Sequence, residues 1–155
     1  MCGIGSNLMS LALLDKFRSA DFVGRDVDEM SVLAAQSNFA SLGLDATFEM
    51  GCSEDLPFDD NSVAMVVCEP PWGLRHLKHS DMGSRLKVWV LEWMRVLKPG
   101  CPAIIITICT NRIESEVIPL VRQKFPGSAL DRKWAYENYG FEQCTCYMLR
   151  KGTGP

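Results

Sequence analysis

Met1-Cys2-Gly3-Ile4-Gly5 and Glu69-Pro70-Pro71-Trp72-Gly73 are the two stretches that decide the fold of this 155-residue chain. Between them, Asp26 comes just after the short apolar run Phe22-Val23-Gly24. A glycine turn that enters a helix, an acid about 20 residues later and a proline corner after a further strand form an order typical of nucleotide-binding α/β folds. The three motifs therefore predict a nucleotide-like cofactor held at one edge of a parallel sheet.

Apolar runs of strand length alternate with segments of helical period along the rest of the chain. We expect helices over residues 7–17, 28–42, 84–97 and 114–125. We expect strands over residues 22–24, 47–50, 63–68 and 103–109. Two alternating segments near the end, 132–136 and 145–149, predict an antiparallel hairpin around Tyr139-Gly140.

This order of elements predicts an α/β, Rossmann-like three-layer sandwich whose sheet is mostly parallel and ends in an antiparallel hairpin. In such folds the glycine turn follows a buried strand, whereas here it follows only Met1. The first strand of the fold is therefore expected to be missing. We expect one domain over residues 1–151, incomplete at its N-terminus, and a flexible tail over 152–155.

The composition is that of an ordinary globular domain, with 47% hydrophobic and 23% charged residues. The formal net charge of −3 excludes a general attraction of the whole molecule to nucleic acid. Any such contact needs a local basic cluster or another domain. No apolar run approaches the roughly 20 residues of a membrane span, so we expect no membrane association.

Seven cysteines are spread along the chain without a C-x-x-C pair. Zinc sites need closely spaced pairs of ligands, so we expect buried or half-buried thiols and no metal. Thiols in this number indicate a reducing compartment. We expect a cytoplasmic protein, with the nucleus as the alternative.

The glycine turn and Asp26 are the candidate cofactor site. Glycines at a strand-to-helix turn let the backbone approach a ligand closely, although they can also mark only a tight bend. An acid at the carboxyl end of a parallel strand can accept hydrogen bonds from both hydroxyls of a ribose. Its alternative role is to cap a helix, but Asp28 already fills that position.

The corner after residues 63–68 is the candidate target site. Two prolines fix the backbone and remove donors, so the neighbouring carbonyls project rigidly. Glu69 and a corner carbonyl can then accept hydrogen bonds from an exocyclic amine, while Trp72 stacks on its base. The alternative is a proline-stiffened loop with a core tryptophan.

Two further segments allow both a functional and a structural interpretation. Arg75, His76, Lys78 and His79 can hold phosphates around a flipped nucleotide, or can be an ordinary solvated loop. The expected helix over 84–97 is apolar nearly all round. Burial inside this domain explains that pattern, with a docking surface for another protein as the alternative.

Together these motifs resemble one known family. From Met1 to Lys151 the chain is similar to the class I methyltransferase domain of the tRNA guanine-N2 methyltransferases that usually carry an N-terminal THUMP domain. The matching segments are residues 1–6, 23–28, 37–38, 55–57, 69–75, 138–141 and 147–151.

The resemblance implies S-adenosylmethionine as the cofactor and assigns roles to individual residues. The residues expected to bind the cofactor are Cys2, Gly3, Gly5, Asp26, Val27, Cys52 and Ser53. Those expected to be catalytic are Glu69, Pro70 and Trp72. Those expected to bind the substrate are Pro71, Gly73, Arg75, His76 and Lys78.

The chain departs from the family pattern in several places. The sequence begins within the family's first motif, so we expect the leading Asp-Pro, the strand before it and a THUMP domain to be missing. Cys52 stands where an acid usually meets the adenine of the cofactor. Glu69 stands where Asp or Asn is usual, and its extra methylene moves the carboxylate by more than about an ångström, which matters in a positioned site.

The family chemistry is direct attack of an exocyclic nitrogen on the sulfonium methyl, helped by positioning and electrostatic support rather than by a covalent intermediate. We expect methylation of the N2 amine of a guanosine in tRNA or another small structured RNA, with a small activator subunit as a further partner. Two alternatives stay open. One is an adenine-N6 or protein-glutamine amino-methyltransferase, and the other is a non-catalytic methyltransferase-like binding module.

Overall fold

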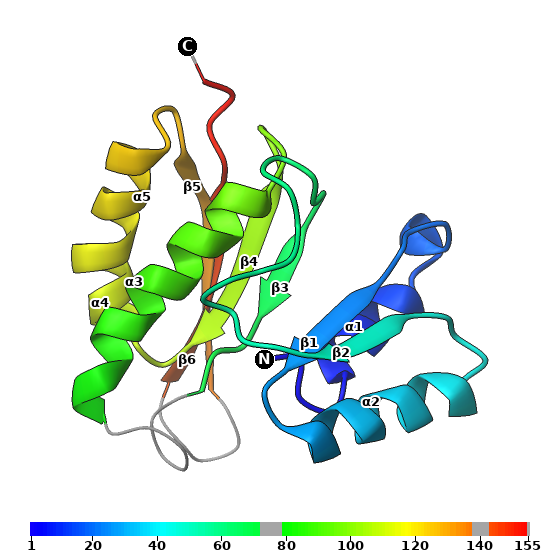
Figure 1. Ribbon diagram of the computed structural model, residues 1–155. Coiled ribbons are helices and arrows are strands. Elements are labelled where there is room, and N and C mark those ends of the chain that lie inside the picture. The colour runs from blue at the N-terminus through cyan, green and yellow to red at the C-terminus, as the bar shows by residue number, and fades with distance from the viewer. Residues whose placement is uncertain (72–78, 138–142, 155) are drawn as a thin grey trace. The chain divides into compact units, whose positions relative to one another are not determined.

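The computed structural model describes residues 1–71, 79–137 and 143–154. The chain divides into two compact units, Met1–Ser53 and Glu54–Pro155. Figure 1 shows the helices and strands of each unit. No helix in the described ranges is both long enough and apolar enough to cross a bilayer.

The first unit is a parallel strand pair with its crossover helix. Strand β1 (Val23–Asp26) runs parallel to β2 (Thr47–Met50), and α2 (Glu29–Ser41) connects them. Helix α1 (Ser6–Ala12) and the 3-10 turn η1 (Asp15–Phe17) come before β1. The strand expected over 47–50 is confirmed, and the one expected over 22–24 extends further, to Asp26.

Helix α2 begins and ends where its sequence signals predict. The Asp28 carboxylate accepts a hydrogen bond from the backbone N–H of Ser31 at 2.9 Å, which satisfies one of the donors left open at a helix start. Beyond the last turn, Gly43 adopts a φ of +63°, a backbone conformation that favours glycine. The helix expected over 28–42 is therefore confirmed.

The core of the first unit joins α2 to β2. The buried side chains are Val32, Ala35 and Phe39 from the helix and Phe48 from the strand. The rings of Phe39 and Phe48 meet edge to face, with centroids 4.9 Å apart. A Cβ atom at Gly24 would lie 2.4 Å from the ring of Phe48, so only glycine fits beneath that ring.

The first helix is shorter than expected. The prediction over 7–17 is wrong beyond Ala12, because Leu14 adopts an extended backbone with φ −87° and ψ 127°. The side chains of Leu13 and Leu14 are exposed, so burial of these side chains does not stabilise another turn of helix there. The separate turn η1 follows instead.

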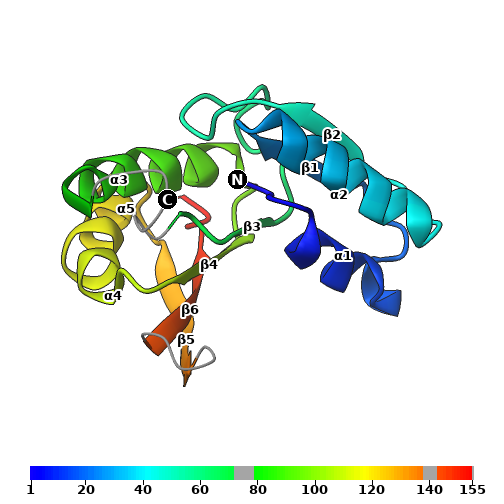
Figure 2. The ribbon, with the colours of Figure 1, turned by 90° about the horizontal axis from the view of Figure 1, so that it is seen from below.

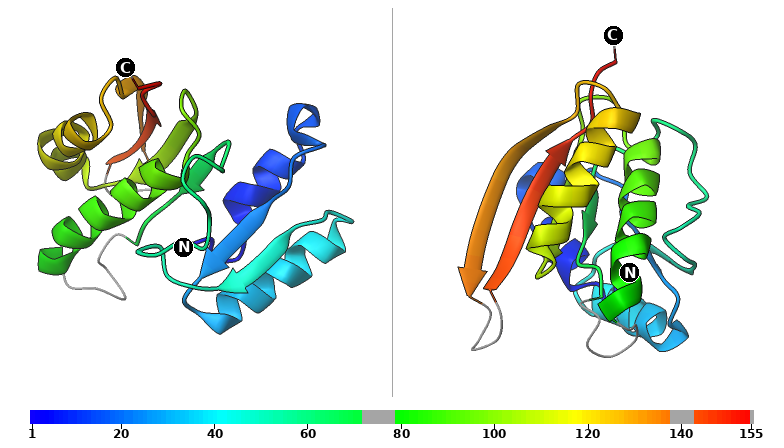
Figure 3. Two further views of the ribbon diagram at one scale, coloured as in Figure 1. Left: turned by 45° about the horizontal axis from the view of Figure 1, so that its top comes forward. Right: turned by 90° about the vertical axis from the view of Figure 1, so that its left-hand side faces the viewer.

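The second unit is a four-stranded sheet with helices on one face. Its elements are β3 (Val66–Cys68), α3 (His79–Val96), β4 (Pro102–Thr107), α4 (Thr110–Arg112), the π-helical turn η2 (Ile113–Val117), α5 (Ile118–Lys124), β5 (Ala129–Glu137) and β6 (Gln143–Arg150). The strand order is β3-β4-β6-β5, parallel between β3 and β4 and antiparallel elsewhere. Figures 2 and 3 show α3 and the α4–η2–α5 segment side by side on the same face of the sheet.

Two predicted strands of this unit change length. The strand expected over 63–68 is confirmed only from Val66 onward. Val63 lies outside β3 and makes a separate parallel bridge with Leu97. The strand expected over 103–109 is β4, which ends at Thr107. There the side-chain hydroxyl of Thr107 accepts a hydrogen bond from the N–H of Cys109 at 3.0 Å, which turns the chain out of the sheet.

Both predicted helices of this unit start earlier than expected. Helix α3 begins at His79 instead of residue 84, and the helix expected over 114–125 is the continuous α4–η2–α5 segment from Thr110 to Lys124. The π-helical turn lies directly before Ile118-Pro119. Proline has no N–H for the regular helical bond, which accounts for a wider turn at this place.

The closing hairpin is confirmed as the antiparallel pair β5–β6. Both strands are longer than expected, and the pairing shifts register between Leu130 and Arg132. The predicted turn at Tyr139-Gly140 lies outside the described residues. The hairpin joins the parallel part of the sheet through β6, which pairs with β4.

Helix α3 supplies most of the core of the second unit. Its fully buried side chains are Leu86, Val90, Trp93, Met94 and Val96. Beneath it, Ala103 and Ile105 of β4 and Tyr147 and Leu149 of β6 are also buried. Burial of this apolar helix is therefore confirmed.

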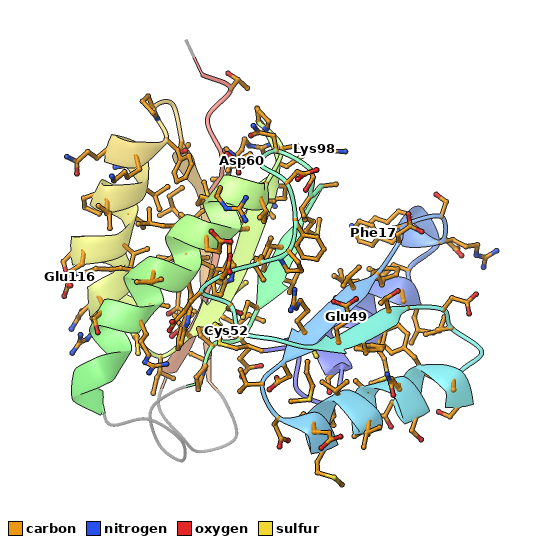
Figure 4. The ribbon with its side chains drawn as sticks, viewed as in Figure 1. Phe17, Glu49, Cys52, Asp60, Lys98 and Glu116 are labelled. Atoms are coloured by element: carbon orange, nitrogen blue, oxygen red, sulfur yellow. The ribbon has the colours of Figure 1, made fainter. Side chains whose placement is uncertain are left out.

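Arg95 of α3 binds the connecting segment, residues 54–62. Its guanidinium uses all five N–H donors, at 2.6 to 3.0 Å, on the Glu92 and Asp60 carboxylates and on the backbone carbonyls of Leu56 and Phe58. The Glu92 carboxylate also accepts the N–H of Leu56 at 2.8 Å. Figure 4 shows Asp60 beside the last turns of α3. A segment without regular structure thereby gains partners for its backbone polar groups.

The end of β6 is anchored as well. The buried ammonium of Lys151 donates to the Asn61 side chain and to the carbonyls of Arg95 and Leu97 at 2.8 to 2.9 Å. The next residue, Gly152, is buried and donates its N–H to the Ser128 hydroxyl at 2.9 Å. Ordered contacts therefore continue into the first residue of the segment expected to be a tail.

Candidate functional site

The glycine motif forms a tight turn at the start of α1. The N–H of Gly5 donates to the carbonyl of Cys2 at 3.0 Å, which closes a four-residue turn. Gly3 adopts a φ of +52° and Gly5 a φ of +86°, so both positions favour glycine. No atom lies within 4 Å of a Cβ built on Gly3, so this side of the turn is open to a ligand.

Asp26 holds this turn at the carboxyl end of β1. Its Oδ2 atom accepts the N–H of Gly3 at 2.8 Å, and its Oδ1 atom accepts the N–H of Asp28 at 3.1 Å. The same Oδ2 atom lies 3.6 Å from the Met1 ammonium. An ionised carboxylate has about four acceptor positions, so Oδ1 can accept one more hydrogen bond, such as the one expected from a ribose hydroxyl.

The other predicted cofactor residues follow the ends of the same two strands. The N–H of Gly51 donates to the carbonyl of Asp26 at 2.9 Å, which brings the chain after β2 beside the end of β1. Cys52 is exposed and lies just beyond β2, as Figure 4 shows, and Ser53 is half-buried. Val27 is 64% exposed, which leaves its apolar side chain available to a planar group.

The cysteines are present as thiols. All seven lie in the described ranges, and none forms a disulfide bond. Six are buried or half-buried as expected, but the expectation is wrong for Cys52, which follows the open edge of the strand pair. Burial raises the pKa of the Cys2 thiol, so Cys2 is a neutral thiol beside the glycine turn at neutral pH.

The predicted target site begins at the carboxyl end of β3. Glu69 is exposed, Pro70 is buried and Pro71 is half-buried. The buried proline ring anchors the corner and leaves the carboxylate beside it in solvent. The remaining predicted residues lie outside the described ranges: Trp72, Gly73, Arg75, His76 and Lys78.

Neither the hollow in the first unit nor the arrangement of potential metal ligands adds to these sites. A hollow of about 330 Å³ lies between the end of α2 and the start of β2, lined by Gln36, Gly43, Asp45 and others. It is at the opposite end of the strand pair from the glycine turn and contains none of the predicted site residues. Among the described residues, no three His, Cys, Asp or Glu side chains gather as metal ligands.

Sequence reasoning gave no role to Asn38, which contacts the glycine turn. Its side-chain Nδ2 donates to the carbonyl of Ile4 at 3.0 Å. The signal in the sequence is an amide on the helix face that also carries Ala35 and Phe39, at helical spacing. A polar group on an apolar face indicates a specific partner.

Comparison with known proteins identifies the family. A family described as "Methyltransferase domain" matches residues 1–100, which is more than half of the chain. A search of curated protein sequences finds no significant match.

Solved structures share the fold at low sequence identity. TrmN from Thermus thermophilus is 19% identical with a TM-score of 0.79, over 97% of this chain and 42% of TrmN. NSun6 from Pyrococcus horikoshii, solved with SFG, is 14% identical with a TM-score of 0.76, over 96% of this chain and 46% of NSun6. An rRNA methylase from Streptococcus thermophilus is 14% identical with a TM-score of 0.69, over 98% of this chain and 83% of the methylase.

The chain thus spans less than half the length of TrmN and of NSun6. The likeness confirms the α/β, Rossmann-like fold predicted from the sequence. None of these comparisons supports the expected activator subunit. The chain belongs to the methyltransferase-domain family and is a methyltransferase domain that uses S-adenosylmethionine.

Proposed function

We propose that this domain methylates an exocyclic amine of an RNA base, the N2 amine of a guanosine in tRNA or another small structured RNA. The cofactor residues of the proposal are Cys2, Gly3, Gly5, Asp26, Val27, Cys52 and Ser53. The target amine is received by the corner that begins at Glu69.

The observation that carries the proposal is the corner after β3. A parallel strand ends in a carboxylate that is exposed, followed by a proline that is buried. Sites that methylate an amine need acceptors for its N–H groups, and a carboxylate beside a carbonyl fixed by proline supplies two. An RNA substrate is also consistent with the rRNA methylase among the proteins of this fold.

The chemistry follows from these acceptors. S-adenosylmethionine supplies a methyl group on a positively charged sulfur, which leaves as a neutral thioether. The amine nitrogen uses its lone pair to form the N–CH3 bond as the C–S bond breaks, and its N–H groups become more acidic. Glu69 and the Pro70 carbonyl accept those N–H groups, so their interaction strengthens as positive charge develops on the nitrogen. A proton is then lost to Glu69 or to water, which restores a neutral amine.

The test is methyl transfer from labelled S-adenosylmethionine to a mixed pool of small RNAs, with the product nucleosides identified by mass spectrometry. Wild type, Glu69→Ala and the control Asp21→Ala are compared, since Asp21 is an exposed acid that is not among the predicted site residues. We expect N2-methylguanosine from wild type and from the control. Glu69→Ala should lose turnover by about 10²-fold or more with little change in RNA affinity.

The same measurement separates the remaining possibilities. N6-methyladenosine, or methylation of a glutamine amide in a protein substrate, would replace the proposed target with one of the alternatives. Full activity of Glu69→Ala would remove the corner from the site. Trp72→Ala tests base stacking and should weaken RNA binding by about 1–3 kcal/mol while leaving cofactor affinity unchanged.

A further inference from the structure

We propose that Asn38 is a positioning residue for the glycine turn and that it sets the affinity of the site for the amino-acid end of S-adenosylmethionine. The inference rests on the proposed function, because it takes Gly3 and Gly5 to contact that cofactor. Asn38 is half-buried on α2. Its partner is the turn itself.

Asn38 fixes one peptide of the turn. Its Nδ2 atom donates to the carbonyl of Ile4 at 3.0 Å. At the other end of the same peptide, the N–H of Gly5 donates to the carbonyl of Cys2 at 3.0 Å. The Ile4–Gly5 peptide is therefore held at both ends, by the turn on one side and by α2 on the other.

Packing places the same peptide against α2. A Cβ atom on Gly5 would lie 3.3 Å from the Cβ of Ala35 and 3.4 Å from the ring of Phe39, so the turn rests directly on these side chains. Ala35, Asn38 and Phe39 share one face of the helix, because residues three and four apart are neighbours. The apolar pair sets how closely the turn approaches the helix, and the amide sets the direction of its carbonyl.

The direction of that carbonyl matters for a negatively charged ligand group. A carbonyl oxygen repels a carboxylate, whereas backbone N–H groups attract one. By drawing the Ile4 carbonyl toward α2, Asn38 keeps this oxygen from turning to the open side at Gly3. Asp26 binds the other part of the turn, through the N–H of Gly3. Asn38 should therefore affect the amino-acid end of the cofactor, and Asp26 the nucleoside end.

The experiment compares two ligands by calorimetry, S-adenosylmethionine and 5′-methylthioadenosine, which has the nucleoside but no amino-acid group. Asn38→Asp keeps the shape of the side chain, removes the donor and places an acceptor against the Ile4 carbonyl. We expect S-adenosylmethionine to bind about three- to tenfold more weakly, which is the range for one lost hydrogen bond. The affinity for 5′-methylthioadenosine should be unchanged.

Gln36→Glu is the matched control. It makes the same amide-to-carboxylate change on the same helix, and its Nε2 atom also donates to a backbone carbonyl, that of Phe48 at 3.4 Å. We expect both ligands to bind this variant as they bind wild type. Thermal melting of each protein checks that it is folded, and Asn38→Ala replaces Asn38→Asp if the latter is not.

Three outcomes are decisive against the inference. Equal losses for both ligands would mean that Asn38 only supports the fold, and no loss for either would mean that it does nothing for the site. In both cases binding by wild type leaves the proposed function standing. Failure of wild type to bind either ligand would refute the proposed cofactor site, and the inference with it.

Discussion

Replacing Arg95 with methionine should destabilise the second unit by removing the five hydrogen bonds that hold the connecting segment. Methionine keeps much of the apolar stem but has no N–H donor. The acceptors left behind are the carboxylates of Glu92 and Asp60 and the carbonyls of Leu56 and Phe58. The size of the effect depends on which of these groups water can reach.

The buried acceptors determine the cost. Asp60 is mostly exposed, so water replaces the guanidinium there and little is lost. The Glu92 side chain is only 13% exposed, and the two carbonyls are part-buried. At about 0.5–1.5 kcal/mol for each of three such acceptors, the free energy of unfolding should fall by about 1.5–4.5 kcal/mol.

The assay is urea unfolding of wild type, Arg95→Met and Arg95→Lys. Lysine should recover only part of the loss, because one ammonium cannot match the five donors of the guanidinium fork. Arg150→Met is the control, since Arg150 also binds an acid, Asp131, and a backbone carbonyl, but its side chain is 50% exposed. We expect the control to lose less than about 1 kcal/mol. A loss below about 1 kcal/mol in Arg95→Met, or an equal loss in the control, would contradict this account.

Three further predictions follow from single residues. The hydrogen-bonded guanidinium lowers the pKa of Glu92, so its stabilisation is complete above the unfolded value of about 4.3 and is lost as the pH falls through the lower folded value. The difference in unfolding free energy between wild type and Glu92→Gln should therefore shrink as the pH falls. A difference between their urea midpoints that stays constant with pH would contradict this prediction. Gly24→Ala places a Cβ 2.4 Å from the ring of Phe48 and should lower the unfolding free energy by about 1–3 kcal/mol; a neutral result in chemical unfolding would show that β1 yields easily. Gly152→Ala places a Cβ 1.9 Å from the carbonyl oxygen of Pro126, so it should lower the melting temperature clearly, and an unchanged melt would mean that the segment is loose.

The parts of the fold that were predicted correctly depend on local signals. Helix α2 has a capping acid at Asp28 and a glycine stop at Gly43, and both act within a few residues of the helix. The shorter form of β3 was not predicted, because Val63 pairs with Leu97, a residue far along the chain. A hydrophobic pattern indicates that Val63 lies in a strand, but it does not identify the residue with which Val63 pairs.

The same distinction holds for the candidate site. Asp26 was predicted as a cofactor residue because an acid at that distance after a glycine turn is a pattern in its own right. Asn38 was missed as a functional residue because its acceptor, the carbonyl of Ile4, lies 34 residues earlier and is a backbone atom. The hydrogen bond between them depends on how α2 packs on the turn, which no local motif encodes. The functional roles assigned to residues at the glycine turn and at the target corner, Asp26 included, stay predictions.

The strand order of the second unit has a consequence for the synthesis of the chain. β6 follows both β4 and β5 in the sequence, yet it lies between them in the sheet. Until Arg150 has been translated, β5 has no partner in the sheet and β4 is paired on one side only. At a translation rate of about 5–20 residues per second, the strand edges and the apolar face of α3 stay exposed for several seconds before β6 is available to pair.

A nascent chain in that state presents unpaired strand edges, which are sites of aggregation. The first unit is different, because its βαβ connection is complete once β2 has been made. Protection by ribosome-associated chaperones should therefore be needed mainly while residues 54–150 are emerging, and the final strand acts as the step that ends this exposure.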